Sequence, residues 1–322
     1  MINNLVSIII PSYNKELYIR ESILSVVNQT YQNWELIIID DLSIDNTIEI
    51  IREFCRNEKR ISYFINSKNS GANYSRNLGL EKALGEYILF FDADDILLPN
   101  CLKERVENIV LGNYDFCVFS MGVFKNKIGD SSYVWKPNSH KPLNDFMQHK
   151  LPWSILQPIW KASFLKSFKG FDESFSRFQD VELHTRILFT QPKNYRLVVS
   201  EPDCYYRIDE ARKNYSPYIF IEHRINSTIL YYSKFYEYAK PLKLQRLLCG
   251  TVYSTYLQLI FALKNKTISE HDFRVLDKKL ASSVINLPNY KLLLFKFSKK
   301  VNLSHFKLPG FNYCMNFIFT RF

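Results

Sequence analysis

Apolar and polar stretches alternate along the first third of the chain in a pattern that predicts strands and helices in turn. Apolar residues recur at helical spacing within 17–27, 48–54 and 71–84, with turn residues between these segments. Short runs rich in β-branched and aromatic residues, each typical of a buried strand, lie at 5–10, 34–39, 61–65 and 87–91. This alternation indicates βαβ units, and therefore an α/β fold with a mostly parallel sheet flanked by helices.

Polar side chains follow three of these predicted strands, at the point where each apolar run stops. Pro11 and Tyr13 follow the first strand, Asp41 follows the second, and Asp92 and Asp94 follow the fourth. Ligands of parallel α/β sheets bind beyond the carboxyl ends of the strands. We therefore expect these three strand ends to line one crevice.

The acidic run at 92–95 indicates a metal site. Asp92 and Asp94 lie on the same side of the chain if it stays extended there. Carboxylates this close repel one another unless a cation lies between them. Mg²⁺ and Mn²⁺ prefer oxygen ligands and often share them with phosphate groups, so either ion fits. The alternative interpretation is a polar turn that caps the helix beginning near Leu102.

The alternating pattern ends near residue 216, where longer helical patterns at 219–238 and 242–263 take over. Residues 216–322 carry 16 Lys and Arg against 5 Asp and Glu, a balance of +11, whereas the whole chain carries +10. We therefore predict an α/β domain at 1–215 and a helical, basic and aromatic region at 216–322. The run 247–263 approaches the ~20 apolar residues of a membrane span. Its Gly, Thr, Ser and Gln favour instead a helix packed on the domain or on a partner subunit, such as a second copy in a homo-oligomer.

The tail from residue 290 onward mixes Lys with Phe, Tyr and Leu. This composition suits a segment that seats apolar groups in an anionic membrane surface while each Lys contributes about 1 kcal/mol through the head groups. An ordinary amphipathic helix with a solvated Lys face is the alternative. Nucleic acid is not expected as a partner, because no binding motif accompanies the positive charge.

Several functional classes lack support in this sequence. No GxGxxG follows the first predicted strand, and neither GxxxxGK[ST] nor GxSxG occurs, which argues against a dinucleotide-dependent oxidoreductase, a P-loop NTPase and a hydrolase. The six Cys form no CxxC pair, as expected in a reducing cytosol. The first residues lack the basic and apolar regions of a signal peptide. The six His are dispersed, which leaves carboxylates as the expected acid–base groups.

Five motifs lie at 6–14, 35–47, 69–79, 92–99 and 170–183. Their order along the chain resembles that of glycosyltransferase family 2, whose members have the GT-A fold. Their order over roughly the first two thirds of the chain is more specific than any one of them. The resemblance implies a Rossmann-like GT-A domain that binds a nucleotide sugar, followed by the helical region.

The resemblance also implies roles in donor binding. Asp41 would bind the base, because a carboxylate can accept a hydrogen bond from the imide N–H of uracil. Pro11 and Tyr13 would line the nucleoside pocket, with Tyr13 packed on the base. Arg76 would hydrogen-bond the base or a phosphate; its alternative is a solvated position on a helix. Asp92 would lie near the ribose or the metal.

The remaining roles concern the metal and the base. Asp94 would bind the Mn²⁺ or Mg²⁺ that bridges the donor diphosphate, while Asp95 either joins this site or caps the next helix. Asp180 matches the family's base, which takes the proton of the acceptor hydroxyl in inverting transfer. Gln179 stands where a Glu is more usual. The alternative role of Asp180 is a helix cap, and Glu182 is the reserve base.

Two positions depart from the family pattern. Asp209 stands where members often have His, and a carboxylate cannot donate to a diphosphate, so this contact would pass to Arg207, Arg212 or Lys213. Leu42 replaces a frequent Gly in the turn after the second strand.

Residues 110–165 correspond to the family's variable stretch, in which 118–120 predicts a further strand. Family members usually bind the acceptor through this stretch, which here contains Trp153, Gln157 and Trp160. An aromatic ring can stack on a sugar face. A position in the core is the alternative for either Trp.

The function that the resemblance implies is metal-dependent, inverting transfer of a sugar from a nucleotide-sugar donor, UDP-linked, to a hydroxyl of a glycan or lipid-linked acceptor. The expected context is bacterial O-antigen, capsule or lipopolysaccharide biosynthesis, with the protein cytoplasmic and peripheral on the inner face of the cytoplasmic membrane. One alternative is a non-catalytic nucleotide-sugar-binding or scaffold subunit, which would tolerate the loss of Asp94 or Asp180. A nucleotidyltransferase would instead have a Gly-rich, basic loop after the first strand, and this chain has none there.

Overall fold

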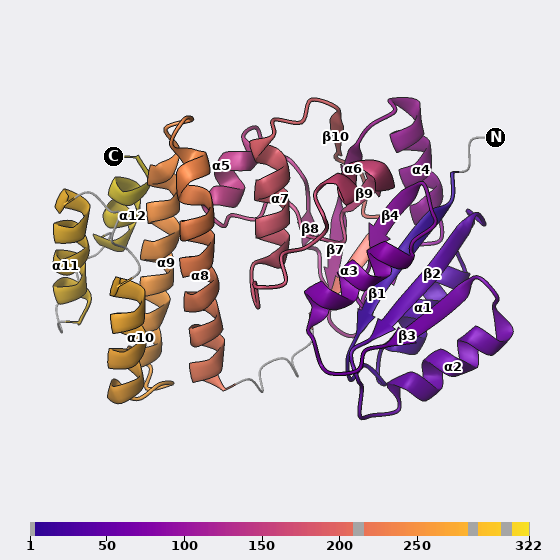
Figure 1. Ribbon diagram of the computed structural model, residues 1–322, viewed down its shortest axis with the longest axis horizontal. Coiled ribbons are helices and arrows are strands. Elements are labelled where there is room, and N and C mark those ends of the chain that lie inside the picture. Colours follow the sequence, from indigo (N-terminus) through magenta and orange to yellow (C-terminus); the bar gives the residue numbers. More distant parts are fainter. Residues whose placement is uncertain (1–3, 209–215, 283–288, 304–310, 322) are drawn as a thin grey trace. The chain divides into compact units, whose positions relative to one another are not determined.

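The computed structural model describes residues 4–208, 216–282, 289–303 and 311–321. Internal contacts divide the chain into two compact units, coloured along the sequence in Figure 1. The first unit comprises Met1–His140, Leu151–Ser174 and Arg186–Glu210, and the second comprises Lys141–Lys150, Phe175–Thr185 and Ala211–Phe322. The second unit thus includes two segments that precede residue 216. The predicted domain boundary at 215 stays a prediction.

The first unit is built on a sheet in which the described strands follow the order β10-β6-β9-β4-β1-β2-β3. The strands pair in parallel, except that β9 runs antiparallel to both β4 and β6. Their bounds are β1 (Val6–Ser12), β2 (Trp34–Asp40), β3 (Ile61–Ile65), β4 (Tyr87–Phe90), β6 (Phe116–Phe119), β9 (Pro158–Lys161) and β10 (Tyr195–Val198). This arrangement confirms the predicted α/β class with a mostly parallel sheet.

Helices cover both faces of this sheet, which explains why its central strands are apolar on both sides. One face carries Ile8 and Ile38 in a core shared with α1, α2 and α4. On the other face, α3 approaches β1 so closely that a Cβ on Gly79 would lie 2.4 Å from Cγ2 of Ile9. The helices of this unit are α1 (Ile19–Val27), α2 (Thr47–Asn57), α3 (Ala72–Lys82), α4 (Cys101–Leu111) and α6 (Ala162–Ser167).

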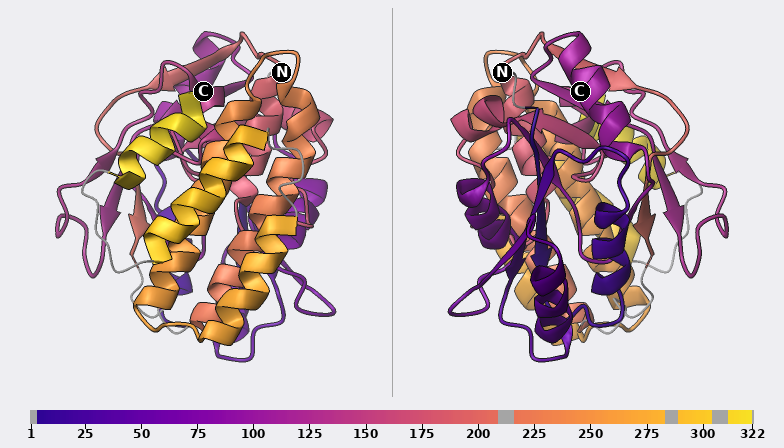
Figure 2. Two further views of the ribbon diagram at one scale, coloured as in Figure 1. Left: turned by 90° about the vertical axis from the view of Figure 1, so that its left-hand side faces the viewer. Right: turned by 90° about the vertical axis from the view of Figure 1, so that its right-hand side faces the viewer.

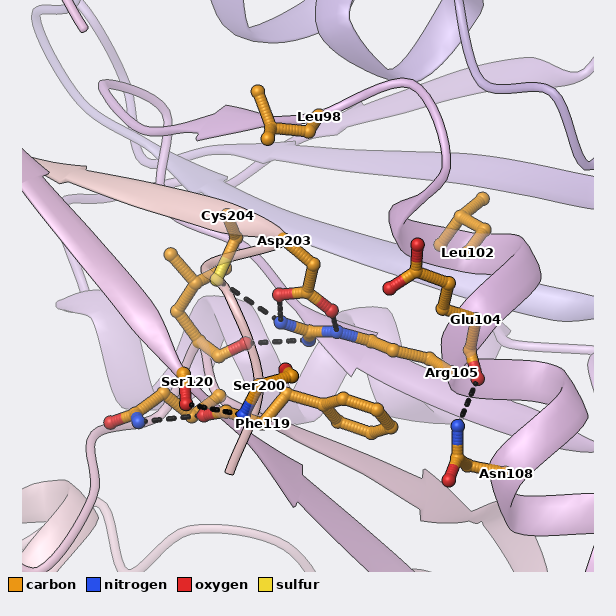
Figure 3. Close-up of polar contacts among 12 residues, drawn as sticks. Leu98, Leu102, Glu104, Arg105, Asn108, Phe119, Ser120, Ser200, Asp203 and Cys204 are labelled. Carbon is orange, nitrogen blue, oxygen red and sulfur yellow. Dashed lines mark hydrogen bonds and ion pairs between the residues drawn. The ribbon is translucent and has the colours of Figure 1, made fainter. Parts of the chain in front are cut away.

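A second, smaller sheet in the same unit has the strand order β5-β11-β7-β8. A buried ion pair holds it against α4: the Arg105 guanidinium donates to both oxygens of Asp203 at 2.7 Å (Figure 3). The same guanidinium donates to the carbonyl oxygen of Leu156 at 2.8 Å. Asp203 immediately precedes β11, so this contact fixes where that strand starts. The bounds are β5 (Ile96–Leu97), β7 (Met121–Phe124), β8 (Val134–Trp135) and β11 (Cys204–Arg207).

The second unit is helical in its described part, and α9 is its central helix. α9 contacts α5, α8, α10, α11 and α12, several of which are seen side by side in Figure 2. Its buried face includes Leu248, Tyr253 and Leu259. The bounds are α5 (Pro142–Met147), α7 (Gln179–Phe189), which continues into the first unit, α8 (Pro217–Ala239), α9 (Gln245–Lys264), α10 (Glu270–Ser282), α11 (Asn289–Leu303) and α12 (Phe311–Arg321).

Among the described helices, α9 alone is long and apolar enough to cross a membrane by length and composition. In this structure 67% of its most apolar 18-residue window is buried by other parts of the protein. That burial is expected of a core helix, and it agrees with the prediction that the Gly, Thr, Ser and Gln of this run favour packing.

Several predicted boundaries need correction. The helix expected from residue 17 begins at Ile19, and Leu17 is 78% exposed, because 15–18 form a turn that precedes the helix. The strand expected at 118–120 is β6, which begins two residues earlier at Phe116. Part of the predicted tail, 304–310, lies outside the described residues.

Candidate active site

Three carboxylates gather where β4 ends. Asp92, Asp94 and Asp95 each offer an oxygen, and these oxygens all lie within 4.8 Å of one another. Asp94 and Asp95 are fully buried, while the side chain of Asp92 is 27% exposed. Oxygen ligands at this separation fit a hard divalent cation such as Mg²⁺ or Mn²⁺.

Within the described residues, Arg76 and Lys15 form ion pairs with this acidic cluster. Nη2 of Arg76, on α3, lies 2.7 Å from Oδ1 of Asp92. Nζ of Lys15, in the turn between β1 and α1, lies 2.6 Å from Oδ2 of Asp94. Sequence reasoning named Arg76 but missed Lys15. Its position in the turn at the carboxyl end of β1, two residues after Tyr13, places it at the predicted crevice but does not indicate its pairing with Asp94.

Asp95 has a structural partner in the neighbouring sheet. Its Oδ1 accepts a 2.9 Å hydrogen bond from the backbone N–H of Arg207, and Nε of Arg207 donates to the carbonyl oxygen of Asp94 at 2.9 Å. The suggestion that Asp95 caps the next helix is wrong, because β5 intervenes and Asn100 is the N-cap residue of α4. Arg207 also pairs with Glu21, which sequence reasoning missed.

Asp41 holds the loop that leads into α3. Its carboxylate accepts hydrogen bonds from Nδ2 of Asn66 at 2.7 Å and from the backbone N–H groups of Ser70 at 2.8 Å and Gly71 at 2.7 Å. The side chain is 4% exposed. Because α3 carries Arg76, Asp41 helps to position that residue as well.

The nucleoside residues predicted to follow the first strand lie at the carboxyl end of β1, which extends to Ser12. Pro11 is half-buried within the strand, and Tyr13 follows the strand with 44% of its surface exposed. An exposed ring at this edge is accessible for packing on a planar group, and its contact with a base stays a prediction.

The predicted base lies on α7, in the part that belongs to the second unit. Asp180 is half-buried in the first turn of this helix. Glu182 is fully buried and pairs with Nζ of Lys234 on α8 at 2.8 Å. This ion pair gives Glu182 a structural role within its unit. The catalytic assignments of both acids stay predictions.

The remaining predicted residues are placed as follows. Trp153 and Trp160 are fully buried, which is typical of core residues. Gln157, also buried, bonds the backbone carbonyl oxygens of Phe119 and Trp135. Contact of these side chains with an acceptor stays a prediction. The suggested roles of Asp209, Arg212 and Lys213 fall outside the described residues.

Comparison with known proteins finds relatives among bacterial glycosyltransferases. UDP-Glc:alpha-D-GlcNAc-diphosphoundecaprenol beta-1,3-glucosyltransferase WfgD of Escherichia coli is 42% identical over 122 residues, covering 38% of this chain and 47% of that protein. The putative teichuronic acid biosynthesis glycosyltransferase TuaG of Bacillus subtilis is 41% identical over 103 residues, covering 32% and 41%. The chain thus matches about half or less of the length of these relatives.

Among solved structures, residues 1–349 of TarS from S. aureus match with a TM-score of 0.64 at 20% identity, covering 97% of this chain and 90% of that one. Mannosyltransferase PcManGT of Pyrobaculum calidifontis, in complex with GDP-Man and Mn²⁺, matches with a TM-score of 0.54 at 15% identity, covering 98% and 84%. At these identities the likeness concerns the fold, and it supports the predicted GT-A class.

The sequence model described as glycosyl transferase family 2 matches residues 7–168, about half of the chain. This range contains Asp41, Arg76 and the acidic cluster at the end of β4, and it ends before Asp180. The chain therefore belongs to glycosyl transferase family 2.

Proposed function

We propose that this protein transfers a sugar, with inversion, from a nucleotide-sugar donor to a hydroxyl of a glycan or lipid-linked acceptor. The observation that carries the proposal is that Arg76 is buried and has N–H groups without hydrogen-bond acceptors among the described residues. Its side chain is only 5% exposed beside the acidic cluster, and within the described part of the chain its Nε and Nη1 have no hydrogen-bond partner. Buried guanidinium N–H groups nearly always find acceptors. A phosphate or base oxygen of the donor would supply them.

Asp41 has room for a ligand as well. A carboxylate offers about four acceptor positions, and the hydrogen bonds from Asn66, Ser70 and Gly71 use three. The imide N–H of uracil would take the fourth, with Tyr13 packed on the base and Pro11 beside it. Solved structures of TarS with UDP and with UDP-GlcNAc support a UDP-linked donor.

The acidic cluster would hold Mn²⁺ or Mg²⁺ through Asp94 and Asp92. Its spacing and burial fit such an ion, and the Lys15 ammonium already places a positive charge at Asp94. When bound, the ion would neutralise the charge that grows on the departing nucleoside diphosphate. Arg76 would hold Asp92 in place from the other side. Arg207 would hold the loop at Asp94 and Asp95 in position through its hydrogen bonds to both residues.

Asp180 would act as the base. It would accept the proton of the acceptor hydroxyl while the oxygen of that hydroxyl attacks the anomeric carbon and the bond to the diphosphate breaks. Glu182, already paired with Lys234, is the less suitable base because its carboxylate is engaged. Trp153 and Trp160 remain candidates for shaping the acceptor site.

The names of the relatives support the cellular context that we propose. WfgD is named for an acceptor carried on undecaprenol diphosphate, and TuaG for teichuronic acid biosynthesis. A role in bacterial surface-polysaccharide synthesis at the inner face of the cytoplasmic membrane is consistent with the names of these two relatives. It is also consistent with the +11 charge of residues 216–322. The alternative is a non-catalytic nucleotide-sugar-binding subunit. Retention of both Asp94 and Asp180 favours the enzyme.

The experiment compares release of UDP from UDP-sugars by the wild-type protein, by Asp94→Ala and by Glu107→Ala, with Mn²⁺ and with chelator. Glu107 is an exposed acid on α4 and serves as the matched control. We expect Asp94→Ala and chelator each to abolish release, and Glu107→Ala to leave it unchanged. Activity of Asp94→Ala at the wild-type level in chelator would refute the metal role. A wild-type protein that binds UDP-sugars but never releases UDP would support the non-catalytic alternative.

A further inference from the structure

The ammonium of Lys15 can move while the backbone of this residue stays fixed. Its backbone N–H donates a 2.7 Å hydrogen bond to Oγ1 of Thr47 at the start of α2, which fixes the turn. Its Nζ reaches Oδ2 of Asp94 at 2.6 Å, and the Lys15 side chain is 22% exposed, against 1% for Asp94. The lysine side chain has a flexible stem of four carbons. Its ammonium can therefore rotate toward solvent while the backbone of the turn stays in place.

Two other cations in the described part of the chain make different contacts near the cluster. Arg76 pairs with Asp92. The guanidinium of Arg207 bonds the backbone carbonyl oxygen of Asp94, not its carboxylate, and also pairs with Glu21. Of these three described cations, Lys15 is the one that forms an ion pair with the Asp94 carboxylate. Its ammonium lies at the carboxylate to which the proposed function assigns the metal.

We infer that the Lys15 ammonium and the divalent cation compete for Asp94, so that Lys15 neutralises the site in the metal-free protein and must leave before the metal binds. This inference rests on the proposed metal role of Asp94. Mg²⁺ approaches its oxygen ligands to about 2.0–2.1 Å. The Lys15 ammonium, 2.6 Å from Oδ2 of Asp94, would repel a cation that binds the same carboxylate. Free protein consequently binds metal weakly, and Lys15 sets how weakly.

The test measures binding of Mn²⁺ alone to the full 322-residue chain, by calorimetry or by electron paramagnetic resonance, without donor. Lys15→Met removes the ammonium and keeps the length of the side chain. We expect Mn²⁺ affinity to rise about tenfold, within the range typical of coupled binding events. Lys59→Met, at an exposed lysine in the turn before β3, is the matched control and should bind Mn²⁺ as wild type does. Equal or weaker binding by Lys15→Met would overturn the inference.

Two further variants separate a failure of the competition from a failure of the metal site. Lys15→Gln keeps a polar group against the buried acid, and it should also tighten Mn²⁺ binding if Lys15→Met folds poorly. Asp94→Asn should weaken Mn²⁺ binding in either background. If Asp94→Asn weakens binding while neither Lys15 variant tightens it, the metal site stands and the competition alone fails. If Asp94→Asn has no effect on Mn²⁺ binding, the metal lies elsewhere and both proposals fail.

A measurement on the unmodified protein tests the displacement directly. An amine-reactive acylating reagent, read out by peptide mass spectrometry, reports how available each lysine is. Labelling of Lys15 should rise several-fold when Mn²⁺ is added, whereas labelling of Lys59 should stay constant. Labelling of Lys15 that Mn²⁺ leaves unchanged or lowers would contradict the inference.

Discussion

The backbone N–H of Arg207 donates a 2.9 Å hydrogen bond to Oδ1 of Asp95, although 112 positions separate the two residues. Arg207 ends β11 in the smaller sheet, and Asp95 follows β4 of the larger one. The Nε of Arg207 adds a second contact, to the carbonyl oxygen of Asp94. The acidic loop is therefore held from two directions, by its own strand and by a strand of the neighbouring sheet.

This relationship predicts that Asp95 acts mainly in stability. Asp95→Ala leaves the buried N–H of Arg207 without its acceptor, which should lower the free energy of unfolding by about 1–3 kcal/mol. Asp95→Asn keeps a carbonyl oxygen at the same place and should lose clearly less. Urea unfolding of the two variants measures the difference. Equal losses would show that the charge, and not the hydrogen bond, is what matters at this position.

Asp180 and Glu182 should separate into a catalytic and a structural acid. Asp180→Asn should lower kcat by about 10²-fold or more, the usual contribution of a general base, with the Kd for UDP near that of wild type. Glu182→Gln breaks the buried pair with Lys234 and should cost about 1–3 kcal/mol of unfolding free energy. Steady-state kinetics and urea unfolding on both variants measure the two effects. Unchanged turnover in Asp180→Asn would reject it as the base.

The second unit should lose stability in mild acid because of His149. Burial, helped by the nearby charge of Arg224, lowers the pKa of His149 from 6.5 to about 3. The unfolded chain thus binds the proton more readily, so stability is complete above pH 6.5 and falls as pH drops toward 3. From pH 7 to pH 5 this one group should remove about 2 kcal/mol.

His149→Phe should abolish that part of the pH dependence, since its ring already packs among those of Phe178 and Tyr231. His271→Phe, at an exposed position on α10, is the control and should keep the wild-type pH dependence. Urea unfolding at pH 7 and pH 5 gives the comparison. A wild-type slope in His149→Phe would show that another group is responsible.

Leu42 occupies a backbone conformation that favours glycine. Its φ is +67° in the turn after β2, and its side chain is 44% exposed. The left-handed conformation costs a residue with a Cβ about 1–2 kcal/mol. Part of this cost is offset because Gly is more flexible when unfolded, so Leu42→Gly should stabilise the protein by about 0.5–1 kcal/mol. Leu42→Ala keeps the Cβ and should not stabilise it, as thermal unfolding can check.

The strands β1 to β4 could be predicted because their signals are local. The apolar runs that end at Asp40 and before Asp92 are buried strands that stop where the sheet meets solvent, and the period of the pattern marks the helices between them. The family resemblance followed from motifs in the same stretch. Even the turn at Leu42 was visible, as a departure from a frequent glycine.

The contacts of the site could not be predicted, because they join residues that are distant along the chain. Nothing in the local pattern pairs Lys15 with Asp94, 79 positions away, or Arg207 with Asp95. The role of Asp41 in holding the loop before α3 depends on backbone N–H groups, which carry no signature in side-chain type. The burial of Trp160 likewise depends on how β9, which contains it, inserts between β4 and β6.

The central claim is that this protein transfers sugar from a nucleotide donor, and one measurement tests it most directly. Purified wild-type protein and Asp180→Asn are incubated with Mn²⁺ and a panel of UDP-, GDP- and dTDP-sugars, and release of nucleoside diphosphate is followed. The account predicts that the wild-type protein releases UDP from at least one UDP-sugar and that Asp180→Asn releases far less. Release of no nucleotide from any donor, or equal release by both proteins, would contradict it.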